Sequence, residues 1–170
     1  ADDLDTAIGT LAAHTESGDI NISNTGALIV GTINFTPFLS VVSGFSSLIG
    51  VVINDIADDN TGSDNITIVA SSPLTVNSLV ANNDGGNITL TSTNDGGNDD
   101  HLTISANVRI TGGDATIDAD GNIDLNAGTD LIINNNAVVS TDASGVITGD
   151  ADRAISISTA SAAVQSVNGG

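Results

Sequence analysis

A short unit recurs along the chain: a glycine, then Asp or Asn, then an apolar, a polar and a second apolar residue. It occurs at 18–22, 86–90, 113–117 and 121–125, and 64–68 carries it with Asp in place of the glycine. Apolar and polar residues that alternate after a turn doublet are typical of a short β-strand with one buried face. The sequence therefore predicts an all-β fold built from internal repeats.

The spacing of the repeats favours a parallel β-helix, also called a β-solenoid. Ile66 and Ile88 lie 22 residues apart, as do Ile88 and Ile110, and the next steps, to Leu131 and Ile155, are 21 and 24 residues. Further short apolar pairs lie between these positions, so each period predicts one coil of three strands with polar corners. We expect apolar rows inside and Asn and Thr ladders at the corners. A β-sandwich, with typical strands of about 5–6 residues joined by hairpins, is the alternative.

Four segments are expected along the chain. They are an N-terminal cap at 1–17, the first strands of the solenoid at 18–35, an apolar insertion or assembly segment at 36–57, and the solenoid repeats at 58–170. The apolar residues of the cap are spaced by three and four, which suits either a short amphipathic helix or a capping strand. From residue 64 onward the repeats would form roughly five coils.

The segment 36–57 interrupts the repeat with apolar and small residues. Its uncharged run is shorter than the ~20 residues of a membrane span and contains Pro, Ser and Gly, so we expect no integral membrane span. The run is expected either to lie buried against the solenoid or to join subunits into a fibre. The candidate interface residues are Phe35, Phe38, Leu39, Val41, Val42, Phe45, Leu48, Ile49, Val51 and Val52.

Composition excludes several classes of function. The chain has no Cys and only two residues that are Lys or Arg, and its formal charge is −19. Such a surface repels polyanions, so nucleic-acid binding is excluded. Without cysteine there is no disulfide framework, thiolate metal site or thiol nucleophile. Asp and Asn replace Glu and Lys throughout, which favours a secreted protein at the cell surface.

Calcium is the one ligand that the sequence supports, because Ca²⁺ takes carboxylate and carbonyl oxygens from flexible loops. The candidate ligands are Asp58, Asn60 and Asp64 in one loop, Asp99 in a second, and Asp118 and Asp120 in a third. The second loop, 96–102, shares part of the glycine-rich calcium nonapeptide pattern, but the pattern occurs once and a corner turn is its expected role.

No catalytic constellation is evident, and we do not expect an enzyme. His14 and His101 are the only imidazole bases, and neither lies in a recognisable motif. The carboxylates of Asp118, Asp120 and Asp124, together with those of Asp99 and Asp100, would suit a polysaccharide-active β-helix enzyme, which is kept as an alternative. Against it, the chain is poor in the basic residues that stabilise developing charge and in aromatic platforms for sugars.

The stretch 108–131, VRITGGDATIDADGNIDLNAGTDL, resembles the repeats of large bacterial haemagglutinin-like adhesins and related autotransporter passengers. The resemblance covers 64–157 and, more loosely, 18–35. It implies a right-handed parallel β-helix in an exported, cell-surface or fibrous protein, and it assigns no functional residue.

The expected function is an extracellular structural or adhesive module, with self-assembly into a surface fibre as one form of it. Its partners would be other copies of the chain or other domains of a larger surface protein. A calcium-stabilised binding module and the polysaccharide-active enzyme are the alternatives.

Overall fold

The computed structural model describes residues 4–34, 47–53, 64–83, 85–105, 107–112, 121–141, 145–158 and 163–166. In these ranges the fold is all-β, with three six-stranded sheets, one two-stranded sheet and no helix. The first sheet contains β1 (Leu4–Thr6), β4 (Ile20–Asn24), β9 (Ile66–Ala70), β12 (Ile88–Ser92), β15 (Ile123–Ala127) and β18 (Ile147–Ala151), in that order.

The second and third sheets follow the same order along the chain. The second contains β2 (Thr10–Leu11), β5 (Leu28–Val30), β10 (Leu74–Val76), β13 (Leu102–Ile104), β16 (Asp130–Ile133) and β19 (Ala154–Ile157). The third contains β3 (Ala13–Thr15), β8 (Val51–Ile53), β11 (Val80–Asn82), β14 (Arg109–Gly112), β17 (Val138–Thr141) and β20 (Ala163–Ser166).

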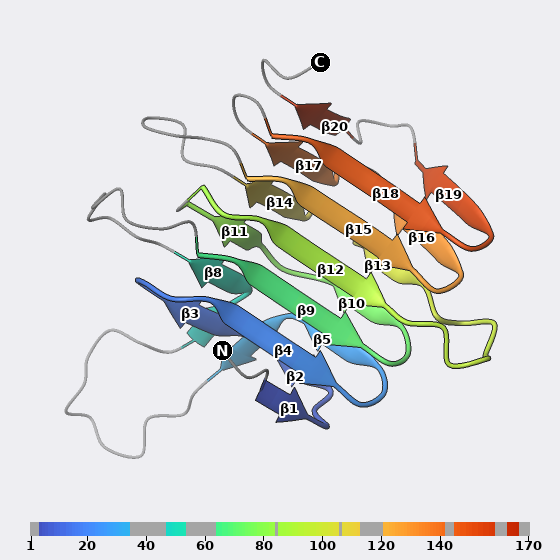
Figure 1. Cartoon of the computed structure of the whole chain (residues 1–170), viewed down its shortest axis with the longest axis horizontal. Helices are drawn as coiled ribbons and strands as arrows, with labels where there is room; N and C mark the ends of the chain where they lie inside the picture. The colour runs from blue at the N-terminus through green and yellow to red at the C-terminus, as the bar shows by residue number, and fades with distance from the viewer. Residues whose placement is uncertain are drawn as a thin grey trace.

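The chain passes through the three sheets in turn, and we call each pass a coil. Strands of successive coils lie side by side from the N-terminal to the C-terminal end of the body (Figure 1). Every pairing within the three large sheets is parallel, as in the register Ile66 to Ile88 to Ile123. This arrangement is compatible with the predicted solenoid, whereas a Greek-key sandwich would pair its strands antiparallel.

Rows of apolar side chains fill the space between the sheets. The five-residue strands β4, β9, β12 and β15 of the first sheet alternate buried and half-buried positions, which follows from the period of two in a β-strand. In the central coils Ile66, Ile88 and Ile123 are fully buried and stack on one another. Burying one such side chain stabilises the fold by about 1.5–3 kcal/mol, so these rows are the main source of stability.

The register of the coils differs from the one predicted from spacing. The steps from Ile66 to Ile88 and from Leu131 to Ile155 join true neighbours. Ile110, however, lies in the third sheet beside Val80, so it is not a neighbour of Ile88. The error arose because the coils differ in length: a long connection separates β12 from β13, and it shifts every later strand. In the described residues from 64 onward, four coils begin, at β9, β12, β15 and β18, where about five were expected.

The N-terminal segment is itself a coil. Strands β1, β2 and β3 pair in parallel with β4, β5 and β8, so the described residues of 1–17 form strands and no helix. The segment 36–57 is divided. Its strand β7 (Ser47–Ile49) forms an antiparallel hairpin with β6 (Thr32–Asn34), while β8 belongs to the third sheet.

Candidate functional site

A ladder of Asp and Asn side chains runs along the corner that precedes the first sheet. Asp19 Oδ1 accepts a hydrogen bond from the backbone N–H of Asn65 at 2.7 Å, and Asn65 Oδ1 accepts one from that of Asn87 at 3.0 Å. The ladder continues from Asn87 to Asn122 at 3.0 Å and from Asn122 to Val146 at 2.9 Å. The repeated turn doublet thus places one side-chain acceptor at the same corner in four successive coils, which confirms the predicted ladder here.

The ladder has a structural role. Each acceptor oxygen receives a backbone N–H from the next coil, which leaves it less available to a ligand. One such bond typically contributes about 0.5–1.5 kcal/mol, and a continuous series of them fixes the coils in register.

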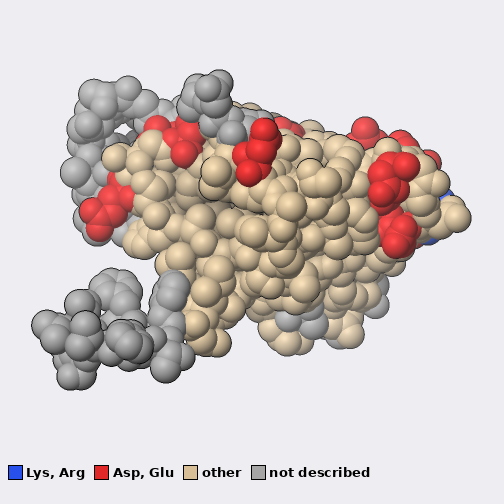
Figure 2. Space-filling view, turned by 90° about the horizontal axis from the view of Figure 1, so that it is seen from below, with Lys and Arg blue, Asp and Glu red and all other residues tan. Residues whose placement is uncertain are grey.

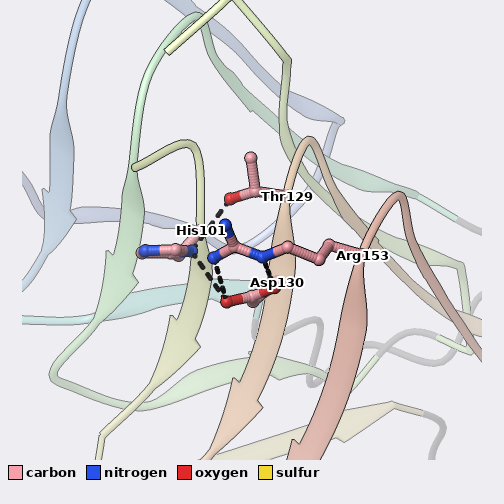
Figure 3. A network of polar contacts seen from close by, with 4 residues as sticks. All are labelled: His101, Thr129, Asp130 and Arg153. Atoms are coloured by element: carbon pink, nitrogen blue, oxygen red, sulfur yellow. Dashed lines mark hydrogen bonds and ion pairs between the residues drawn. The ribbon is translucent and has the colours of Figure 1, made fainter. Parts of the chain in front are cut away.

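A second polar cluster joins three consecutive coils and contains His101, Thr129, Asp130 and Arg153 (Figure 3). Arg153 donates to Asp130 through both arms of its guanidinium, from Nε to Oδ1 at 2.7 Å and from Nη2 to Oδ2 at 2.6 Å. His101 Nδ1 lies 2.9 Å from Thr129 Oγ1 and 3.6 Å from Asp130 Oδ2. This bidentate geometry is the arrangement in which a guanidinium holds a carboxylate most specifically.

Electrostatics keeps both members of this ion pair charged. Hydrogen bonds from Arg153 hold the pKa of Asp130 below its ordinary value, against the effect of desolvation, and the charges of Arg153 and His101 act in the same direction. The hydrogen bonds that Arg153 donates to Asp130 raise the pKa of Arg153. An ionised carboxylate held by a guanidinium is a poor proton donor or acceptor near neutral pH. The geometry of the cluster therefore favours a structural role, in which the ion pair links neighbouring coils, over a catalytic one.

We expect Arg153→Gln to lower the melting temperature by only a few degrees at neutral pH, because the pair is partly exposed. The deficit should shrink on acidification. A carboxyl with a lowered folded pKa stabilises the fold above its unfolded pKa of about 3.9, and this contribution is lost as the pH falls through the folded value. Circular dichroism melts between neutral and strongly acidic pH measure the effect. Arg109→Gln, at an exposed position of β14, is the control, and a pH-independent deficit would contradict the assignment.

Of the predicted calcium ligands the structure describes only Asp64 and Asp99, and these two lie apart. Asp58, Asn60, Asp118 and Asp120 lie outside the described residues. Asp64 precedes β9 and accepts a hydrogen bond from the backbone N–H of Gly18, whereas the exposed Asp99 follows β12, near the other end of the first-sheet strands. In the described ranges no three His, Cys, Asp or Glu side chains are already arranged to hold a metal ion.

The predicted interface residues are only partly described. Phe35, Phe38, Leu39, Val41, Val42 and Phe45 lie outside the described residues. Of the others, Ile49 is 57% exposed on the β6–β7 hairpin, and Leu48 and Val52 are half-buried. Val51 is fully buried in the core of its own chain, so it is not accessible to a partner.

Other candidate residues lie apart from one another. His14 is exposed on β3, and Asp124 lies on β15, where it accepts a hydrogen bond from Thr148 in the next coil.

The face seen in Figure 2 is mostly uncharged, with acidic side chains in separate groups. No helix in the part of the chain that the structure describes is long and apolar enough to cross a membrane.

The cluster around Asp130 was not predicted from the sequence. A signal was present in the sequence: Leu131 and Ile155, 24 residues apart, are neighbours in the second sheet. In the same register Asp130 lies beside Ala154, and Arg153 immediately precedes Ala154 in the chain.

Comparison with known proteins finds no relative: no family model, curated protein or solved structure matches the chain.

Proposed function

We propose that this chain is a structural or adhesive module of a secreted or cell-surface protein. In this proposal it folds as a parallel β-solenoid and joins further copies of itself end to end. Its lysine-free composition and its likeness to adhesin repeats support the extracellular assignment. The parallel sheets and the corner ladder support a rigid body, since each coil is fixed to the next by backbone pairing and by side chains.

One observation carries the self-association: the rows of the core continue into the terminal coils but are uncovered there. Ile155 is 53% exposed, although it is in register with Leu131, which is 2% exposed. At the other end Leu4 is 61% exposed, although its partner Ile22 is 5% exposed. Among the described strands, those of the first and last coils are paired on one side only.

A second copy of the chain could supply the missing strand partners at each end, through the same parallel pairing that already joins the coils. Its β1, β2 and β3 would add to β18, β19 and β20, extending each sheet in the same order and direction. Uncovered strand edges are ready-made templates for such pairing. The apolar rows would continue across the junction, so association would bury Leu4 and Ile155.

The test compares the wild type with two variants of β19. We expect sedimentation velocity and negative-stain electron microscopy to show rods that lengthen with concentration. Ile155→Asp should remain folded but stay monomeric, because it charges the uncovered row. Ser156→Asp, on the same strand with the opposite orientation, is the matched control and should assemble. A wild type that stays monomeric at every concentration, or an Ile155→Asp variant that assembles as well as the wild type, would contradict the proposal.

A further inference from the structure

The connection between β12 and β13 gathers three carboxylates around a single glycine. An idealised Cβ on Gly97 would lie 2.7 Å from Asp99 Oδ1, 3.1 Å from Asp95 Oδ1 and 3.7 Å from Asp100 Oδ2. Because glycine has no side chain, the three carboxylates can approach its Cα closely. Oxygen atoms from three different side chains therefore border a small cradle beside Gly97.

Asp100 is unusual in this group because it is fully buried. Its Oδ2 accepts a hydrogen bond from the backbone N–H of Asp95 at 3.0 Å, but its Oδ1 has no hydrogen-bond partner among the described residues. A buried carboxylate with one oxygen unpaired is unfavourable unless a proton or a cation compensates it. The backbone of Asp100 is fixed as well, since its carbonyl accepts a hydrogen bond from Thr129 N at 2.9 Å.

The nearby cationic side chains in the described part of the chain are engaged elsewhere. Arg153 binds Asp130 through both arms of its guanidinium, and His101 lies against Thr129 and Asp130. Asp100 therefore has no salt bridge among the described residues. A cation from solution can supply the compensating positive charge.

We propose that the Asp95, Asp99 and Asp100 carboxylates bind a divalent cation at the cradle beside Gly97, with Ca²⁺ as the preferred ion. The ligands are hard oxygen atoms on a loop whose exposed members, Asp95 and Asp99, can rotate toward the ion. Such adjustment is needed because the three are not yet arranged as a metal cluster. Ca²⁺ accepts flexible, irregular oxygen coordination, whereas Mg²⁺ demands near-ideal octahedral geometry. The site differs from the predicted set, of which it retains only Asp99.

Isothermal titration of the purified chain with CaCl₂, after treatment with a chelator, tests the site. We expect one Ca²⁺ per chain with a dissociation constant of about 0.1–1 mM, the range of extracellular modules, and weaker binding of MgCl₂. Thermal melts with and without CaCl₂ provide the second readout. Binding to the folded state should raise the melting temperature as the concentration of CaCl₂ increases.

Three variants separate a built site from diffuse attraction to an acidic surface. Asp100→Asn keeps the shape of the buried side chain and should weaken Ca²⁺ binding at least about 10-fold, as expected for loss of a ligand charge. Gly97→Ala places a methyl group among the carboxylates and should weaken binding similarly. The chain should stay folded, because the nearest atom is Oδ1 of the Asp99 side chain, which can rotate away. Asp150→Asn, which removes one exposed charge from β18, should bind Ca²⁺ like the wild type. No Ca²⁺ binding by the wild type, or equal binding by Gly97→Ala, would overturn the proposal. Neither result depends on whether the chain self-associates.

Discussion

Replacing Ile123 with Asp is expected to prevent stable folding at 25 °C. Ile123 is fully buried and lies between Ile88 and Ile147 in the apolar row of the first sheet. The substitution removes a large apolar side chain and places an unpaired carboxylate in its position. Together these changes should lower the free energy of unfolding by about 5 kcal/mol or more. Since domains are typically stable by only about 5–15 kcal/mol, most of the folded population would be lost.

The matched control is Thr67→Asp on β9, which introduces the same charge on the outer face. Thr67 is half-buried, and its neighbours in register are Asn21 and Thr89, so no like charge is adjacent. Urea denaturation followed by circular dichroism should show Thr67→Asp within about 1 kcal/mol of the wild type. If Ile123→Asp unfolded at the same urea concentration as the wild type, the inward orientation of Ile123 would be wrong.

Replacing Gly50 with Ala should be the second most damaging change. Gly50 has a φ of +71°, and a Cβ there would lie 2.0 Å from the carbonyl oxygen of Leu79. That carbonyl accepts the hydrogen bond from Val51 N at 2.9 Å that brings β8 into the third sheet. The clash is with backbone, which cannot rotate away, and the left-handed conformation adds further strain. We expect a loss of about 2–5 kcal/mol in the free energy of unfolding.

The control for Gly50 is a glycine in an open position. Gly9 lies in the connection between β1 and β2 and has no heavy atom within 4 Å of its idealised Cβ, apart from its chain neighbours. Gly9→Ala should change the free energy of unfolding by no more than about 0.5 kcal/mol, as measured by urea denaturation. Equal losses in the two variants would show that the close approach of Gly50 to Leu79 does not occur.

Local structure was predictable because its signals lie within a few residues. The unit at 86–90 predicts a turn followed by a strand, and the structure forms β12 there with Ile88 and Leu90 inward. Its Asn87 also indicated the corner ladder, since one residue type recurs at one position of the coil. Strand alternation and turn chemistry are local properties, so each unit predicts its own structure.

The assignment of strands to sheets was less predictable, because it depends on the lengths of the connections. Ile110 has the spacing of a row neighbour of Ile88 but belongs to another sheet. The same limitation concealed the burial of Asp100. The connection that carries Asp100 packs against the next coil, where Gly128 approaches the backbone of Asn94 and Thr129 N donates to the Asp100 carbonyl. Such contacts between coils cannot be derived from the period alone.

Distances between spin labels along one column of the first sheet test the stacking of coils most directly. The chain has no cysteine, so pairs of introduced cysteines can be labelled without interference. Asp5, Ser23, Val69, Thr91, Asn126 and Asp150 occupy successive strands in register. With Asp150→Cys as the fixed partner, labels introduced at positions 5, 23 and 69 should lie about 24, 19 and 14 Å away, since each strand adds about 4.8 Å. Distances that do not increase with the number of intervening strands would contradict the stacked-coil architecture.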